Sequence, residues 1–538
     1  MSQRQRFIRK IVYACVIAAL LLPLSWLSQP AAKDGSKGGL LAQMRAEHNL
    51  SQADLGEIDP ASETIKLATL GMRGVAANIL WEKANQYHKE EDWAGLSATL
   101  EQIVRLQPNF VSVWVFQGWN LSYNISVEFD DYHDRYRWVI KGIDFLKEGT
   151  QYNRDEPRLL TDIGWTVAHK IGKADERVQY RRLFREDDEF NGSRPLAQRD
   201  NWLVGREWLV KAEQIVARGI PLKGKSPLLF YSRPPMCLVN YAQTLEEEGT
   251  FGEVAKNAWK KASDSWTEFS DRDLPTQHNL SVRLGEKEAY LKRAQEAQAE
   301  LARLTPPGLR EEIAKEKFDA LSEQERTAHD TPSEQRTPEQ HALLAGVKHK
   351  LEIHHLDIAD RITGETHSGA FKAAEDATQA DFMAKLIDSE REIVNFDYWT
   401  LKCRIEPDDS TLAARKAMYD GDRAFSKGDL VACSQAYEEG LKTWRQVLDK
   451  YPSLLKDSDL TEDLVASIGH YRSILHQMDK EFPKTFILQD VLDADAALQN
   501  PKVPLSEGAS SGAASSTAND PSNAEVPNKD NDPSKPAP

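Results

Sequence analysis

The stretch Gly421–Leu441 reads GDRAFSKGDLVACSQAYEEGL, and it shows most clearly how this chain is built. Its informative residues, in order, are Gly421, Phe425, Gly428, Asp429, Tyr437, Gly440 and Leu441. Small residues let two helices approach closely, and aromatic side chains fill the space between neighbouring helix pairs. The stretch therefore predicts a helical hairpin at about residues 415–452, with an extended second helix that ends near Pro452.

Two other stretches follow the same pattern, at residues 75–108 and 236–269. In the first, small Ala84 and aromatic Tyr87 are followed by a second apolar stripe, and Pro108 can end the helix that carries it. In the second, small residues recur on both predicted helices, at Ala242, Gly249, Ala255, Ala258 and Ala262. Each stretch predicts two closely packed helices joined by a short turn.

Elsewhere in the body, apolar residues recur every three or four positions, without any run of alternating, strand-like residues. The body is therefore predicted to be all-α, with hairpins stacked in an α-solenoid-like array. The unit of about 34 residues, with a small residue, an aromatic residue and a closing proline, resembles the tetratricopeptide repeat (TPR) superfamily. This resemblance implies a protein that binds other proteins or peptides.

A basic N-terminus precedes the most hydrophobic segment. Ile11–Leu27 has no charged residue, and the basic residues before it are Arg4, Arg6, Arg9 and Lys10. A helix of this length spans about 25 Å, near the lower limit for a bilayer. Because basic residues stay on the cytoplasmic side, the sequence predicts a single-pass membrane protein with a cytoplasmic N-terminus and an extracytoplasmic body. We interpret the segment as a transmembrane signal anchor, and a cleaved signal peptide is the alternative.

Composition divides the chain into six segments. In order, they are the basic N-terminus and anchor at 1–30, a linker at 31–61, an N-terminal TPR-like helical domain at 62–284, a charged helical hairpin with a flexible loop at 285–338, a C-terminal helical domain at 339–499, and a tail at 500–538. The hairpin is predicted because Pro306-Pro307-Gly308 interrupts a run of strong helix formers. The tail has almost no apolar residues, so it is predicted to be disordered.

Charge and cysteine usage exclude some classes of protein. The 538 residues carry a formal net charge of −16, and such an acidic chain is a poor general binder of phosphate backbones. Nucleic acid is therefore not expected as a partner. The four cysteines form no CxxC pair, which argues against a metal knuckle or a redox dithiol. A disulfide between Cys403 and Cys433 is allowed in an exported body, and buried free thiols are the alternative.

Three polar clusters invite a functional interpretation. His349 and His354 are five residues apart, whereas metal ligands on one helix face are three or four apart, so we predict a solvated surface there. The acidic run at 128–134 lacks EF-hand spacing and is interpreted as a turn before a helix that begins near Tyr132. The basic-aromatic run at 180–185 is interpreted as a charged helix face, with a peptide or anionic-lipid contact as the alternative.

No cofactor and no metal ion is predicted, and the helices contain neither HExxH nor GxGxxG.

Several short blocks resemble a family of large bacterial proteins from planctomycetes that carry the label "iron-responsive element". These blocks, all within about residues 55–285, are Ile58–Ser62, Leu106–Phe110, Trp119–Asp131, Tyr180–Phe184 and Arg199–Trp202. The resemblance implies no established activity. The label names an RNA element, and this acidic chain shows no RNA-binding or iron-ligand pattern, so we predict no role in iron regulation.

Two functions follow from this organisation. The first is a membrane-anchored scaffold that mediates protein–protein interaction along the first helix of each pair. In TPR-like hairpins these helices line the concave face, which places the following residues in a groove: Asn78, Trp81, Asn85, His88, Asn120 and Asn124. Amides donate and accept hydrogen bonds, so such a row can hold a peptide backbone, although core packing of Trp81 and solvated or capping asparagines are the alternative. The second function is a cell-envelope enzyme with a pocket in the aromatic-rich region 110–240, for which no catalytic residue is identified.

Overall fold

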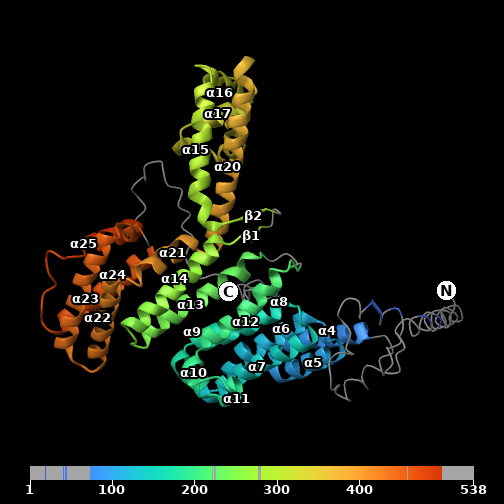
Figure 1. The fold of residues 1–538 in the computed structure, drawn as a ribbon, viewed down its shortest axis with the longest axis vertical. Helices are drawn as coiled ribbons and strands as arrows, with labels where there is room; N and C mark the ends of the chain where they lie inside the picture. Colours follow the sequence, from blue (N-terminus) through green and yellow to red (C-terminus); the bar gives the residue numbers. More distant parts are fainter. Residues whose placement is uncertain are drawn as a thin grey trace, which may run out of the picture.

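The computed structural model describes residues 73–220, 222, 226–276, 280–456 and 458–499, together with the single positions 19, 23, 40, 43 and 44. Most of these residues are helical and very few lie in strands, which confirms the predicted all-α class (Figure 1). Apart from those single positions, the predicted membrane anchor, the linker at 31–61 and the tail at 500–538 lie outside the described residues. Among the described residues, no helix is both long enough and apolar enough to cross a bilayer.

The N-terminal body is a succession of helices, most of which pack on the next long helix in the chain. Its elements are α4 (Arg73–Lys89), α5 (Trp93–Leu106), α6 (Val111–Trp119), η2 (Asn120–Asn124), η3 (Ile125–Glu128), α7 (Tyr132–Tyr152), α8 (Pro157–Trp165), η4 (Thr166–Lys170), α9 (Ile171–Lys173), α10 (Arg177–Glu186), α11 (Asp188–Asn191), η5 (Leu196–Gln198), α12 (Asn201–Val216), α13 (Leu228–Glu247) and α14 (Glu253–Asp271). Helix α4 packs on α5, α6 on α7, α8 on α12, and α13 on α14. The apolar stripes read from the sequence thus meet in helix pairs, although α9, α10 and α11 separate α8 from α12 in the chain.

Acidic side chains determine where several of these helices begin. Asp92 accepts a hydrogen bond from the Gly95 N–H at 2.9 Å and caps α5. Asp131, within the acidic run, accepts one from the His133 N–H at 2.7 Å and caps α7. A side-chain acceptor satisfies one of the free N–H groups at a helix start, and its negative charge matches the positive end of the helix dipole. At this position the acidic run therefore serves as a helix cap.

Glycines let two of the helix pairs pack backbone against backbone. A Cβ atom at Gly142 of α7 would lie 2.7 Å from the Gly118 carbonyl oxygen of α6. A Cβ atom at Gly205 of α12 would likewise lie 2.7 Å from the Gly164 carbonyl oxygen of α8. Because only glycine leaves room for such an approach, these residues set the distance between the helix axes.

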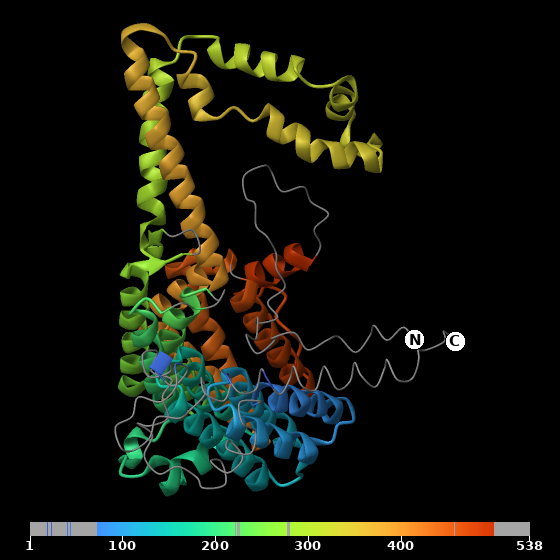
Figure 2. The same cartoon turned by 90° about the vertical axis from the view of Figure 1, so that its right-hand side faces the viewer.

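A two-helix stalk leaves the body after α14, and Figures 1 and 2 show it projecting well beyond the remaining helices. The elements of the stalk and its tip are β1 (Leu274–Pro275), β2 (Ser281–Val282), η6 (Leu284–Glu286), α15 (Lys287–Leu304), α16 (Leu309–Asp319), α17 (Glu323–Asp330), η7 (Ser333–Gln335), α18 (Pro338–Leu351), α19 (His355–Ala359), η8 (Gly364–Thr366) and α20 (His367–Ile393). Strands β1 and β2 pair antiparallel at the base, with Leu274 opposite Val282. The elements between α15 and α20 fold at the far end as a side arm (Figure 2).

The stalk differs from the hairpin predicted at 285–338. Helix α15 packs along α20, not along α16, and α18 belongs to the tip, so the structure shows no boundary at 338/339. The reason is the apolar face of α20, which buries a row of small residues: Ala370, Ala373, Ala374, Ala377, Ala380 and Ala384. Small side chains allow a close approach along a long helix, whereas α16 buries only Ile313.

Arg391 fastens the base of the stalk to the rest of the molecule. Its side chain is buried, and its Nε donates to the Leu284 carbonyl at 2.7 Å. Its Nη1 contacts Glu288 at 3.0 Å and Asp397 at 3.3 Å. One guanidinium therefore connects the start of α15, the end of α20 and the helix that follows, as its several planar donors permit.

The C-terminal module follows the stalk. It comprises α21 (Phe396–Ile405), α22 (Asp409–Ser426), α23 (Leu430–Lys450), η9 (Pro452–Lys456), α24 (Ser458–Gln477) and α25 (Gln489–Gln499). A closely packed helix pair, α22 and α23, lies at the predicted repeat, and a Cβ at Gly421 would meet the Tyr437 ring at 2.6 Å. Helix α21 packs on α14, and α22 contacts both α13 and α14, so the module adjoins the body beside the stalk. Within the described part of the chain, Cys237, Cys403 and Cys433 are buried free thiols.

A buried group of charged residues lies where the module meets the body. Glu246 of α13 accepts a hydrogen bond from the Trp259 indole at 2.7 Å, and Arg415 of α22 donates to Glu406 at 2.6 Å. The side chains of Glu246 and Glu406 are almost fully buried, and the charges of Lys402 and Arg415 also act on Glu246. Burial and the negative charge of Glu406 raise the pKa of the Glu246 carboxyl to about 7.

This raised pKa predicts a pH-dependent stability. In the unfolded chain Glu246 releases its proton near pH 4.5, whereas the folded chain holds the proton up to about pH 7. The contribution of Glu246 to stability is therefore expected to be greatest below pH 4.5 and to fall as the pH rises to 7. Glu246→Gln has no proton to release, so its advantage over the natural chain should grow to roughly 1–3 kcal/mol at pH 7.5. Urea unfolding of both chains between pH 4.5 and 7.5 measures this difference. The exposed neighbour Glu247 provides the control, because Glu247→Gln should show no such trend.

Candidate functional site

A row of partly exposed aromatic rings crosses the first helices of the body. We call this row the aromatic strip, and it consists of Trp81, His88, Phe110, Phe116, Trp119 and Tyr123. The rings of Trp81 and Phe110 are 5.9 Å apart, those of Phe116 and Trp119 are 6.0 Å apart, and those of Trp119 and Tyr123 are 6.3 Å apart. Each ring has another within the range of favourable aromatic contact, so the strip is continuous from α4 to η2.

Helical periodicity and contact between helices together produce this row. Trp81 and His88 lie on one face of α4, seven residues apart, and both contact the Phe116 ring of α6, at 6.4 and 5.9 Å. Phe110 precedes α6, and its side chain is 38% exposed. Helix α4 thus lies beside α6 with aromatic residues along their shared edge, and the rings keep part of their surface open.

The next pair of helices repeats this construction. Gly118-Trp119 stands before the π-helical turn η2, and Gly164-Trp165 stands before the π-helical turn η4. In both, the tryptophan stacks on the residue four positions later, Trp119 on Tyr123 at 6.3 Å and Trp165 on His169 at 4.3 Å. π-Turns are rare and are often found at functional sites. Two of them at matching positions extend the aromatic face from the second helix pair to the third.

Two cations lie over this extended face. The Lys170 ammonium is 4.7 Å from the centre of the Tyr123 ring, and the Arg233 guanidinium is 5.1 Å from that of Trp165. Both distances allow attraction between a cation and the negative face of a ring. Burial lowers the pKa of the Lys170 ammonium. The surface therefore combines flat apolar rings with a few positive charges.

The structure places the six predicted groove residues differently. Trp81 and His88 belong to the aromatic strip, and Asn78 and Asn85 are exposed on the same helix. Asn120 is fully buried, where it accepts a hydrogen bond from Asn124 at 3.0 Å and donates to Gln117 at 3.4 Å. Its amide is thus engaged within the fold and does not face a partner. The asparagines consequently form no single exposed row.

Most of the aromatic strip was not foreseen from the sequence. Phe110, Phe116, Trp119 and Tyr123 depend on how α4 lies against α6, which no local pattern reports. The sequence did contain one usable signal. The dipeptide Gly-Trp occurs at 118–119 and again at 164–165.

The clusters considered in the sequence have structural partners. His355 contacts Asp381 at 3.0 Å, whereas His349 contacts Glu352 at 3.3 Å, so these histidines do not converge. Among the described residues, no group of three or more side chains suited to a metal ion occurs. Arg181 of the basic-aromatic run is buried and contacts Asp200 at 2.9 Å and Glu248 at 2.8 Å. That run therefore contributes to packing between α10, α12 and α13.

A further sequence pattern lies between α12 and α13. Gly219–Ser226 matches the spacing GxxxxGK[ST] of a phosphate-binding loop. Such a loop cradles phosphate when it connects a strand to a helix, but the element before this one is helix α12. Residues 221 and 223–225 lie outside the described residues, and the pattern alone defines no site.

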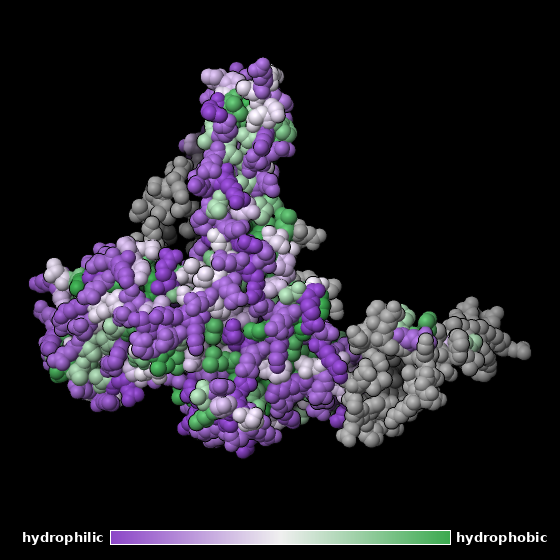
Figure 3. Space-filling model, in the orientation of Figure 1, coloured by the Kyte–Doolittle hydropathy of each residue, from purple (hydrophilic) through white to green (hydrophobic). Residues whose placement is uncertain are grey.

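Hydrophobic residues form separate small areas on the face shown in Figure 3, and hydrophilic residues cover most of it, including the stalk. In comparisons with known proteins, no family model and no curated protein matches the chain. The inference of function therefore depends on the geometry of the aromatic strip and its surroundings.

Proposed function

We propose that this chain is a membrane-anchored, extracytoplasmic scaffold that binds a protein or peptide partner along the aromatic strip. In this proposal the helix pairs are TPR-like units stacked in an α-solenoid-like array. The first helices of the pairs present the binding face, and the N-terminal hydrophobic segment holds the body at the membrane.

The aromatic strip is the observation that supports the proposal most strongly. Aromatic residues are the main anchors of protein interfaces, because each ring buries a large area at a small cost in conformational entropy. Here several neighbouring rings are partly exposed to solvent. The exposed amides of Asn78 and Asn85 lie on α4, the helix that also carries Trp81. Rings can take apolar side chains of an extended segment, and amides can pair with its backbone.

The proposed membrane tether is supported by the sequence. A basic cluster, an uncharged hydrophobic segment and a linker precede the body, in the order expected for a signal anchor. On this topology the aromatic strip faces partners outside the cytoplasm.

Site-specific photocrosslinking tests the proposal. A photoreactive residue in place of exposed Asn85, in the full-length chain in its native membranes, should give a discrete crosslinked protein partner. Trp81→Ala with Phe116→Ala removes two adjacent rings and should reduce that crosslink by at least about tenfold, since truncating a central aromatic anchor typically costs 2 kcal/mol or more of binding free energy.

A matched aromatic residue outside the strip provides the control. Trp138 of α7 is also partly exposed and packs against Phe129 at 5.7 Å, with Lys141 over its ring. Trp138→Ala should leave the crosslink intact, and circular dichroism should show that both variants keep their helices. If Trp138→Ala reduces the crosslink as much as the double variant, or if Asn85 gives no crosslink, the aromatic strip is not the binding face.

A further inference from the structure

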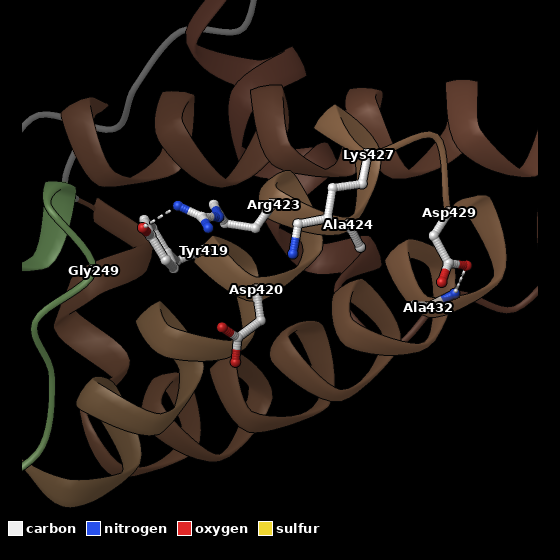
Figure 4. A pocket seen from close by; sticks show the side chains of 8 residues that line it. All are labelled: Gly249, Tyr419, Asp420, Arg423, Ala424, Lys427, Asp429 and Ala432. Carbon is white, nitrogen blue, oxygen red and sulfur yellow. Dashed lines mark hydrogen bonds between the residues drawn. The ribbon is translucent and has the colours of Figure 1, made fainter.

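A hollow of about 510 Å³ opens between the N-terminal body and the C-terminal module (Figure 4). The turn between α13 and α14 forms one side, and the hairpin of α22 and α23 forms the other. The residues that line it are Gly249, Tyr419, Asp420, Arg423, Ala424, Lys427, Asp429 and Ala432. Its volume is within the range of pockets that hold small molecules.

Contacts on one side of the hollow hold its wall in place. Gly249 has a φ of +82°, and a Cβ atom there would lie 2.4 Å from the Tyr419 hydroxyl. The Tyr419 ring also packs on Phe251 at 5.5 Å, and Lys256 contacts Asp409 at 2.5 Å. The turn and α22 therefore meet closely beside the hollow, which gives the site one well-defined wall.

The acidic side chains of the hollow already have partners. Asp429 caps α23 by accepting a hydrogen bond from the Ala432 N–H at 3.0 Å, as Figure 4 shows at one end of the site. Asp420 contacts Lys416 at 2.5 Å. Their negative charges are thus directed to groups of the chain itself.

The basic side chains differ in this respect. Arg423 lies in the last turn of α22 and Lys427 is the residue that follows this helix. Figure 4 shows the Arg423 guanidinium at the Tyr419 hydroxyl, and Lys427 lines the same hollow. Arg423 donates to the Tyr419 hydroxyl at 3.5 Å, which leaves the hydroxyl proton available for an acceptor. Neither Arg423 nor Lys427 forms an ion pair with any residue that the structure describes.

We propose that this hollow binds an anionic group, a carboxylate or a phosphate, between Arg423, Lys427 and the Tyr419 hydroxyl. A guanidinium presents paired N–H donors that match two oxygens of such a group, and the ammonium adds a second positive charge. The small side chains of Ala424 and Ala432 leave space for the ligand. This site is distinct from the aromatic strip and does not depend on the proposed scaffold function.

Calorimetric titration of the purified full-length chain tests the site, with inorganic phosphate and citrate as separate probes in a chloride buffer of constant ionic strength. The natural chain should bind at least one probe saturably. Arg423→Gln with Lys427→Gln should weaken that binding by at least about tenfold, because both charge-assisted contacts are lost. Preference for phosphate or for citrate then shows which of the two groups the site takes.

Two further variants separate a defined site from general attraction. Lys442→Gln removes one exposed positive charge from α23 outside the hollow, and should change the affinity by no more than about twofold. Ala424→Glu keeps both cations and places a carboxylate among them, so it should abolish binding while α22 stays helical. The proposal fails if neither probe binds saturably, if Lys442→Gln weakens binding as much as the double variant, or if Ala424→Glu binds normally.

Discussion

Replacing Arg181 with methionine is expected to destabilise the N-terminal body by about 2–4 kcal/mol. Arg181 is buried in α10, and its guanidinium contacts Asp200 at 2.9 Å, Glu248 at 2.8 Å and the side chain of Asn201. Methionine fills much of the same volume but removes the nearer charge partner of the nearly buried Asp200 carboxylate, which keeps only Arg185, at 3.8 Å. A buried carboxylate that loses its nearer charge partner costs more free energy than the loss of an exposed ion pair.

An arginine with a similar but more exposed pair provides the comparison. Arg194 contacts Glu207 through two parallel hydrogen bonds of 2.8 Å, and the Glu207 side chain is about half exposed. Arg194→Met should therefore cost no more than about 1 kcal/mol. Urea unfolding followed by circular dichroism measures the change in stability of both variants. Equal losses in the two variants would show that burial of the Arg181 network contributes nothing extra.

Local sequence signals were sufficient to predict the helix pairs. Asp92 and Pro108 bracket α5, and the apolar stripe between them repeats every three or four residues, so the element and its buried face both follow from a short window. The same holds for α22 and α23, where Gly428, with a φ of +76°, makes the turn and Asp429 caps the second helix. Turns, caps and periodicity are properties of neighbouring residues.

The stalk could not be predicted in this way, because its pairing is not local. Helix α15 has a partner, α20, that begins only after four other helices, and α15 itself buries little beyond Ala294 and Leu301. Its charged, helix-forming composition predicts a helix but not the helix that covers it. The sequence break at Pro306-Pro307-Gly308 suggested a hairpin, and a proline shows where a helix ends but not which helix it pairs with.

Only the part of the candidate site that depends on local periodicity could be predicted from the sequence. Trp81 and His88 follow from the periodicity of one helix, α4. Asn120 and Asn124 do not, because the chain forms a π-turn over Asn120–Asn124, in which the Ile125 N–H donates to the Asn120 carbonyl. A π-turn accommodates an extra residue, so steps of three and four no longer identify one face. The remaining rings of the aromatic strip depend on contacts between helices.

Close packing at Gly205 leads to the second large effect, and Gly205→Ala is expected to destabilise the body by about 1–3 kcal/mol. The added methyl carbon would lie 2.7 Å from the Gly164 carbonyl oxygen and 2.9 Å from the Ala168 backbone nitrogen. Both are backbone atoms of the continuous helix that includes α8 and η4, so no side chain can rotate away. The two helices must separate, and the buried contacts between them weaken.

The same substitution should have the opposite effect where the methyl group meets nothing. Gly469 lies within α24, and a Cβ atom there has no neighbour within 4 Å. Gly469→Ala should therefore stabilise its helix by up to about 1 kcal/mol, because alanine loses less conformational entropy than glycine on folding. Denaturant unfolding of both variants, with circular dichroism as the signal, gives the two changes. A stabilising Gly205→Ala would mean that α8 and α12 do not approach as closely as the structure shows, since helix propensity alone would then determine the sign.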